Sequence, residues 1–156
     1  MHRHILIPTD GSALSQAAVE YGVALAKSVG AKVTVLAVSA PFNGFAVEPT
    51  MLTETPEQHA KQVAASVAKY LDAAKQVASA AGVGCETLHV EHDHPYLAII
   101  DTASKKSCDL IVMSSHGRHG ITAIVLGSET TKVLTHSSIP VLVVRLPSRP
   151  FFYVPS

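Results

Sequence analysis

Cysteine and charged residues are both scarce in this sequence, and each scarcity excludes a class of protein. The chain contains two cysteines, Cys85 and Cys108, too few for the disulfide framework of a small secreted domain. We therefore expect two free thiols. Charged residues make up 15% of the chain and its formal net charge is zero, which argues against a dominant surface for nucleic acid or an acidic membrane.

Long apolar runs are also missing. No stretch approaches the length that spans a bilayer, and the first residues run straight into a strand pattern without the features of a secretory signal. We expect no membrane partner and a cytoplasmic location. Hydrophobic residues make up 47% of the 156 residues, as in a globular protein. One domain is expected over residues 1–146, followed by an irregular tail over 147–156.

Strand-like and helix-like segments alternate along the chain. Short apolar runs predict strands, which cover residues 3–8, 32–38, 85–90, 109–113 and 139–145. Apolar repeats at three and four residues predict helices, which cover residues 12–29, 55–81, 95–106 and about 128–136. Five strands separated by helices indicate an α/β fold with a parallel sheet covered on both faces.

The same periodicity predicts which residues the helices bury. Ser12 is expected to cap the first helix and Gly30 to end it. The inward residues predicted for this helix are Leu14, Ala17, Ala18, Tyr21, Leu25 and Ser28. Those predicted for the later helices are Leu97, Ile100, Ala103, Val133 and Leu134. The last strand is apolar without alternation, so both of its faces are expected to be covered.

A segment rich in glycine and serine follows the fourth predicted strand, Ser114-Ser115-His116-Gly117-Arg118-His119-Gly120, and Gly127-Ser128 precedes the last helix. Glycine permits positive φ and close backbone approach, so N–H groups can face an anion. A helix N-terminus adds unpaired N–H groups. This pattern predicts a phosphate-binding loop. From the loop alone, a connection that uses glycine only for turning is an equal alternative.

A second turn, Pro8-Thr9-Asp10-Gly11-Ser12, follows the first strand. If the first and fourth strands are neighbours, both turns line one crevice beyond the strand ends. Asp10 would there accept a hydrogen bond from a ribose or base, or bind a metal beside phosphates. Its alternative role is an Asx turn or helix cap.

Together these motifs resemble the universal stress protein family, in its nucleotide-binding subgroup. The family loop G-x2-G-x9-G-[ST] is matched from Gly117, through nine intervening residues, to Gly127 and Ser128, and its first position is Ser114. The opening strand with its Pro-Thr-Asp-Gly-Ser turn also matches, as does the closing Pro-Val-Leu-Val-Val-Arg segment. The resemblance covers residues from about 3 to 145.

The resemblance implies a Rossmann-like fold, similar to the adenine-nucleotide alpha-hydrolases, with sheet order 3-2-1-4-5. It also implies ATP as ligand, with adenine near Val38 and Pro8, Asp10 near the base or ribose, and phosphates on the glycine loop. Mg²⁺ is expected to accompany ATP, held mostly by phosphate oxygens and water. The predicted nucleotide site consists of Pro8, Thr9, Asp10, Val38, Ser114, His116, Gly117, Arg118, Gly120, Gly127, Ser128 and Glu129. A Gly127→Val substitution is expected to block phosphate binding while leaving the fold intact.

Other chemistries have weaker signals. His89, His92 and His94 suit zinc, copper or nickel, but on an extended segment His89 faces away from the other two. An exposed histidine-rich loop is the alternative. His116 and His119 flank the glycine loop and would contact phosphates when protonated; the favoured alternative is a position on the loop surface. Gly127-Ser128-Glu129 lacks the lysine of a Walker A loop, and neither a G-x-S-x-G elbow nor a Ser/His/Asp triad is recognisable.

We therefore expect an ATP-binding module for stress response or signalling, with little or no turnover. A slow enzyme that hydrolyses ATP or cleaves another phosphate is the first alternative, and a dimeric stress module with an empty nucleotide site is the second. A homodimer is expected through the edge strand Val141–Arg145, because an exposed apolar edge favours isologous pairing. The alternative is a monomer whose aromatic tail covers its own sheet edge.

Overall fold

The computed structural model describes residues 2–41, 55–116 and 126–145. Strands and helices alternate along these residues in the predicted order. The strands are β1 (His4–Pro8), β2 (Lys32–Ser39), β3 (Cys85–Glu91), β4 (Leu110–Ser114) and β5 (Val141–Val144). The helices are α1 (Ala13–Val29), α2 (Pro56–Ala80), α3 (Pro95–Lys105) and α4 (Ser128–His136). The predicted tail lies outside the described residues, as do residues 42–54 between the second strand and the second helix.

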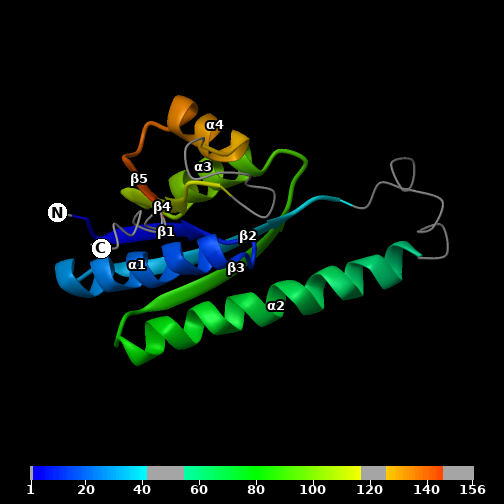
Figure 1. Cartoon of the computed structure of the whole chain (residues 1–156), viewed down its shortest axis with the longest axis horizontal. Coiled ribbons are helices and arrows are strands. Elements are labelled where there is room, and N and C mark those ends of the chain that lie inside the picture. The colour runs from blue at the N-terminus through cyan, green and yellow to red at the C-terminus, as the bar shows by residue number, and fades with distance from the viewer. Residues whose placement is uncertain (1, 42–54, 117–125, 146–156) are drawn as a thin grey trace, which may run out of the picture.

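The strands of the described residues form one parallel sheet in the order β3-β2-β1-β4-β5 (Figure 1), which confirms the predicted fold. β1 is the middle strand and pairs with β2 on one side and with β4 on the other. The chain builds outward from β1 to β3, and then in the opposite direction from β4 to β5. The strand order therefore reverses between β1 and β4, where open parallel sheets bind their ligands.

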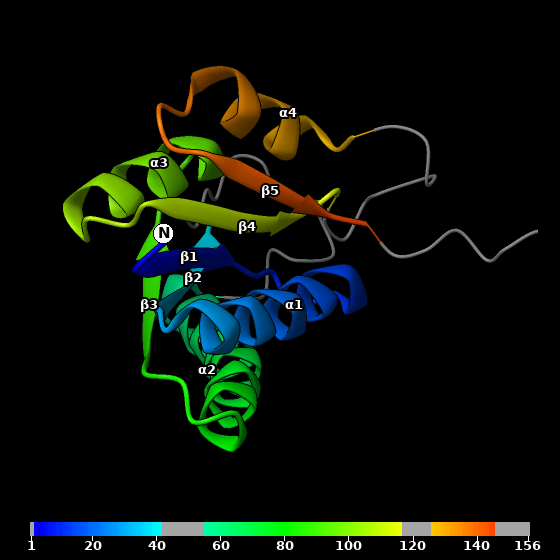
Figure 2. The ribbon, with the colours of Figure 1, turned by 90° about the vertical axis from the view of Figure 1, so that its left-hand side faces the viewer.

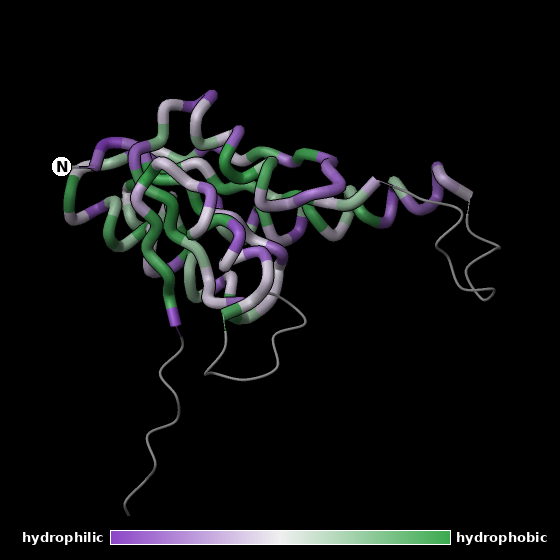
Figure 3. Tube along the Cα trace, turned by 90° about the horizontal axis from the view of Figure 1, so that it is seen from above, coloured by the Kyte–Doolittle hydropathy of each residue, from purple (hydrophilic) through white to green (hydrophobic). Residues whose placement is uncertain are grey.

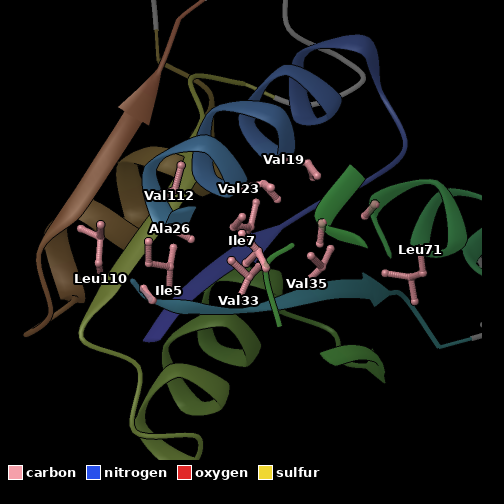
Figure 4. Close-up of a cluster of buried hydrophobic side chains, with 14 of the residues drawn as sticks. Ile5, Ile7, Val19, Val23, Ala26, Val33, Val35, Leu71, Leu110 and Val112 are labelled. Carbon is pink, nitrogen blue, oxygen red and sulfur yellow. The ribbon is translucent and has the colours of Figure 1, made fainter. Parts of the chain in front are cut away.

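Helices cover both faces of the sheet. α1 and α2 lie against one face, and α3 and α4 lie against the other (Figure 2). Strand side chains alternate between the two faces. Ile5 and Ile7 join the core beneath α1 and α2, which Figure 4 shows, whereas Leu6 joins the core beneath α3 and α4. β1 is thus buried on both sides, as its unbroken apolar sequence indicates.

The predicted ends of α1 are confirmed. Ser12 is the N-cap, and its side chain accepts a hydrogen bond from Ser15 N. Gly30 ends the helix in the left-handed conformation, with φ of 74°, which costs glycine little because it has no Cβ. In α2, Thr55 and Gln58 form a capping box, which fixes the start of that helix.

The buried face of α1 differs from the predicted one. Of the predicted inward residues only Ala18 is buried, and Tyr21 is 50% exposed. The residues that α1 buries are Ser15, Ala18, Val19, Gly22, Val23 and Ala26. A Cβ added at Gly22 would overlap Ile7 Cδ1 and would lie 3.0 Å from Ile7 Cγ1. The helix buries small residues because they allow its backbone to approach β1 closely.

The predicted faces of α3 and α4 were also wrong in part. Leu97 and Leu134 are 40% and 41% exposed, whereas Ala103 and Val133 are buried as expected. The residues that α3 buries are Ala98, Ile99, Thr102 and Ala103. The physical reason is that residues 97–100 are all apolar, so this run fits more than one helical face.

β5 is shorter than predicted and forms an edge of the sheet, where it pairs with β4. Each of its four residues is half-buried in the single chain. Leu142 and Val144 pack against one core and Val141 against the other, so the expected cover of both faces is confirmed in part. No further strand of the described residues pairs with the outer edge of β5. The sequence of β5 is Val-Leu-Val-Val, and Figure 3 colours the last strand before the C-terminal grey trace as hydrophobic. Within the described part of the chain, no helix is long and apolar enough to cross a bilayer.

Candidate functional site

A pocket of about 630 Å³ lies at the carboxyl ends of β1, β2 and β4, where the strand order reverses. Its volume is within the range of pockets that hold small ligands and cofactors. The first turns of α3 and α4 complete its walls. The residues that line it are Pro8, Thr9, Asp10, Ser15, Leu36, Val38, Ala40, Pro95, Ile99, Met113, Ser114, His116, Gly127, Ser128, Glu129 and Thr130.

The turn after β1 is held in place by its own side chains. Asp10 Oδ1 accepts a hydrogen bond from Ser12 N at 2.9 Å, which is the Asx turn predicted as one role of Asp10. Thr9 Oγ1 and Ser15 Oγ lie 3.0 Å apart and hydrogen-bond to each other. Gly11 has φ of 79°, a conformation that glycine adopts readily. The turn therefore holds Thr9 and Asp10 at the pocket wall.

The exit of β4 forms the opposite wall. Ser114 Oγ donates to His116 O at 3.0 Å, and Ser114 O accepts from Thr130 Oγ1 at 2.9 Å. The positive-φ residues of the described chain do not include Ser114, so serine carries no left-handed strain at the first position of the loop. His116 is only 9% exposed. Its expected position on the loop surface was therefore wrong, because its main chain is enclosed by the start of α4.

Gly127 brings α4 against this exit. Gly127 N donates to Ser115 O at 2.7 Å. A Cβ at Gly127 would lie 2.9 Å from His116 Cβ and 3.0 Å from His116 Cα. Gly127 has φ of −62°, so space and not backbone conformation requires glycine. A valine at Gly127 would require His116 or the start of α4 to shift, so Gly127→Val is expected to disturb local packing as well as phosphate binding.

The first turn of α4 faces the pocket with Ser128, Glu129 and Thr130. N–H groups in the first turn of a helix have no acceptor within the helix. Gly127 is the N-cap and makes no side-chain hydrogen bond to them. Such a turn carries a partial positive charge, so this end of the pocket is suited to an anion.

The start of α3 supplies a wall that the sequence did not predict. Pro95 and Ile99 line the pocket from this helix. Tyr96 N donates to Glu129 Oε2 at 2.9 Å, which joins the first turns of α3 and α4. Glu129 thus lies at the pocket, but its carboxylate is directed to a backbone N–H of α3.

Nine of the twelve predicted site residues line the pocket: Pro8, Thr9, Asp10, Val38, Ser114, His116, Gly127, Ser128 and Glu129. The other three, Gly117, Arg118 and Gly120, lie outside the described residues. The lining residues that sequence reasoning missed are Ser15, Leu36, Ala40, Pro95, Ile99, Met113 and Thr130. Most of these residues lie inside strands or helices and carry no motif of their own. Only the tertiary packing shows that they face the pocket. Thr130 had a local signal, because it follows Ser128 by two residues in the same helical turn.

The serine and histidine of the loop do not form a hydrolytic site. Ser115 Oγ lies 3.2 Å from His116 Nδ1, but Ser115 is buried and does not line the pocket. The histidines at the end of β3 and just after it likewise do not point to one common site. His89 Nε2 contacts Ser39 Oγ at 2.7 Å, whereas His92 Nδ1 accepts from His94 N. No group of three metal-ligating side chains occurs among the residues that the structure describes.

Perturbed titratable groups lie at the opposite end of the sheet, where β1 begins. His4 is buried, with Nδ1 3.0 Å from Lys106 O and Nε2 2.7 Å from Thr34 Oγ1. Burial lowers the pKa of His4. Cys108 is a free, buried thiol, and burial raises its pKa to about 11. His4 and Cys108 therefore belong to the packing of the sheet and not to the pocket. Cys85 is also a free thiol, so the prediction of two free thiols is confirmed.

A model of the Universal stress protein family matches residues 1–145. The chain belongs to the universal stress protein family. Universal stress protein MJ0531 of Methanocaldococcus jannaschii is 32% identical over 153 residues, which cover 96% of this chain and 85% of that protein.

Two solved structures extend this relationship to the fold. The hypothetical protein MJ0577 matches with a TM-score of 0.79 and 26% identity, covering 95% of this chain and 99% of that one. A universal stress protein in complex with cAMP matches with a TM-score of 0.65 and 26% identity, covering 92% of this chain and 97% of that one. The sheet order and helical layers described above are therefore those of a universal stress protein.

Proposed function

We propose that this universal stress protein binds an adenine nucleotide, with ATP as the principal ligand. The observation that carries the proposal is the pocket at the β1–β4 reversal, which ends on the first turn of α4. A related universal stress protein has been solved with cAMP. The loop that matches the family's nucleotide-binding motif leads into the same helical turn at Gly127 and Ser128.

The two ends of the pocket differ in chemistry as a nucleotide requires. The β2 side is apolar, with Leu36, Val38 and Ala40 on the lining, and suits the faces of a base. Thr9 and Asp10 lie beside it and offer polar groups to a ribose or base edge. The α4 end offers N–H groups and the Ser128 hydroxyl to phosphates. Each part of an adenine nucleotide therefore has a complementary wall.

The carboxylates at the pocket bear on how Mg²⁺ would accompany ATP. Asp10 Oδ1 already accepts from Ser12 N, and Glu129 Oε2 accepts from Tyr96 N. Mg²⁺ in nucleotide sites commonly keeps several waters and uses phosphate oxygens as ligands. The pocket fits this arrangement, in which the chain binds the phosphates and supplies few ligands to the metal.

We further propose that the protein acts as a stress-response binding or signalling module and works as a homodimer. Among the described lining residues, the carboxylates of Asp10 and Glu129 each accept a backbone hydrogen bond, which supports a binding role over rapid turnover. β5 supports the dimer, because its four apolar residues are half-buried at a sheet edge. Pairing with a second copy of β5 would cover them and satisfy backbone groups on that edge.

Ser128 provides the sharpest test of nucleotide binding. It is the first residue of α4, a position that tolerates proline, and Gly127 before it has ψ of 156°, which suits a residue before proline. Ser128→Pro should remove one N–H and the hydroxyl without breaking the helix, whereas Ser128→Ala removes only the hydroxyl. Calorimetric titration with ATP and Mg²⁺ should show about tenfold or greater weakening in Ser128→Pro, since hydrogen bonds to charged groups contribute about 1.5–3 kcal/mol.

Thermal unfolding of both variants provides the control. Equal melting temperatures would show that the difference in ATP affinity between the two variants comes from the lost hydrogen-bond donor and not from a loss of stability. A folded Ser128→Pro protein that binds ATP as tightly as the original chain would refute phosphate binding at α4. Loss of binding in Ser128→Pro with a smaller loss in Ser128→Ala would support it.

A further inference from the structure

Two helices, α3 and α4, begin at the rim of the pocket. The N-terminus of α3 already binds the carboxylate of a side chain from α4. Pro95 is the first residue of α3 and has no N–H, so Tyr96 carries the first N–H donor of that helix. Glu129 Oε2 accepts a hydrogen bond from this N–H at 2.9 Å, while the side chain of the N-cap residue His94 makes no capping hydrogen bond. A carboxylate from α4 therefore caps the start of α3.

Apart from the start of α3, Lys132 is the cation that faces Glu129 in the described chain, and it compensates the carboxylate charge only in part. Lys132 Nζ lies 3.7 Å from Glu129 Oε1 and 5.4 Å from the centre of the Tyr96 ring. The Lys132 and Glu129 side chains are 48% and 39% exposed. Ion pairs this open to solvent are weak, because water screens the attraction between the two charges. A negative charge thus remains on the pocket wall, next to the helical turn that is suited to phosphates.

We propose that Glu129 sets the charge preference of the pocket. Its carboxylate binds the N-terminus of α3, so only the N-terminus of α4 is left for the ligand's phosphates. The phosphates would then lie next to the negative charge of Glu129. The pocket consequently selects the magnesium complex of a nucleoside triphosphate over the metal-free, more negative form. This inference rests on the proposed nucleotide function and adds to it the residue that discriminates between charge states of the ligand.

Simple electrostatics gives the size of the effect. For an assumed separation of about 7 Å between the carboxylate and a phosphate, and an effective dielectric constant of about 40, one unit of charge changes binding roughly sevenfold. Mg²⁺ neutralises part of the phosphate charge, so removal of the carboxylate should help metal-free ATP more than the magnesium complex. Adenosine carries no phosphate and should respond least.

Glu129→Gln tests the proposal because its amide oxygen can still accept from Tyr96 N. Calorimetric titrations would measure dissociation constants for ATP with chelator, ATP with Mg²⁺, and adenosine. We expect metal-free ATP to bind about fivefold or more tightly to Glu129→Gln than to the original chain, with adenosine changed by less than about twofold. Glu57→Gln is the matched control, because Glu57 is in the first turn of α2 and does not line the pocket.

The outcomes separate this inference from the proposed function. If the original chain binds ATP and Glu129→Gln leaves the ratio of metal-free to magnesium-bound affinities unchanged, the inference is overturned and nucleotide binding stands. An equal gain in Glu57→Gln would assign the effect to net charge and would also overturn it. If the original chain binds neither form of ATP nor adenosine, the proposed function fails and the inference with it.

Discussion

Gly22→Ala tests how closely α1 packs on the central strand. Alanine is favoured over glycine within a helix by about 1 kcal/mol. The new Cβ, however, would overlap Ile7 Cδ1 and lie 3.4 Å from Val112 Cγ1, and Ile7 is 0% exposed. Overpacking of such a core costs about 1–3 kcal/mol. We therefore expect Gly22→Ala to lower the free energy of unfolding by up to about 2 kcal/mol.

Ile7→Val removes the atom that the new methyl group would overlap. Alone it should destabilise by about 0.5–1.5 kcal/mol. In the double variant the overlap with Cδ1 is gone but the 3.0 Å contact with Cγ1 remains, so the Gly22→Ala cost should shrink and the coupling should be about 1 kcal/mol. Urea denaturation gives the free energy of unfolding of all four proteins, and the comparison holds when the dependence of that free energy on urea concentration is the same for each. Additivity within about 0.5 kcal/mol would refute the close contact.

Gly84→Ala provides a matched control for this cycle. An added Cβ there would lie 3.8 Å from its nearest neighbour, Lys32 Cβ, which is an ordinary van der Waals contact. We expect this substitution to combine additively with Ile7→Val. Coupling of the same size in both pairs would show that the measured effect does not come from the contact between Gly22 and Ile7.

Three further predictions follow from burial and from the sheet edge. Burial lowers the pKa of His4 from 6.5, so its contribution is complete above pH 6.5 and is lost as pH falls below that value, by at most about 1.4 kcal/mol per pH unit; urea midpoints of His4→Gln should show a shallower acid decline than those of the original chain, and identical declines would contradict this. Because burial raises the pKa of Cys108 to about 11, iodoacetamide at pH 8 should label it in the folded protein far more slowly than in urea; mass spectrometry showing equal rates would contradict its placement. The original chain should scatter light as a dimer and Val143→Lys as a monomer, whereas a single-chain mass for the original protein would exclude the β5 dimer.

The sheet and the general position of the pocket could be predicted from the sequence. Turn residues after the first and fourth strands mark two chain segments that a parallel sheet brings to one edge, and the family resemblance implied the strand order that makes them neighbours. The caps Ser12 and Gly30 were predictable because their chemistry is local. Nine residues of the predicted site consequently line the observed pocket.

Features that depend on close packing could not be predicted in the same way. The face of α1 is set by the space that Gly22 leaves over Ile7, and periodicity favours larger residues such as Tyr21. The α3 wall and the hydrogen bond from Tyr96 N to Glu129 depend on how two helices distant in sequence meet. The role of Gly127 was only half predicted, because its contact with His116 requires glycine even without a ligand.

An amide spectrum of isotope-labelled protein, titrated with ATP and Mg²⁺, tests nucleotide binding and its location together. If the pocket between β1 and β4 holds the nucleotide, saturable shifts should appear at the amides of Ser128, Glu129 and Thr130, where the phosphates bind. Further shifts should appear at Thr9 and at the end of β2, where the base and ribose lie. Absence of shifts at saturating ATP, or shifts confined to α2 and β3, would contradict a nucleotide site in this pocket.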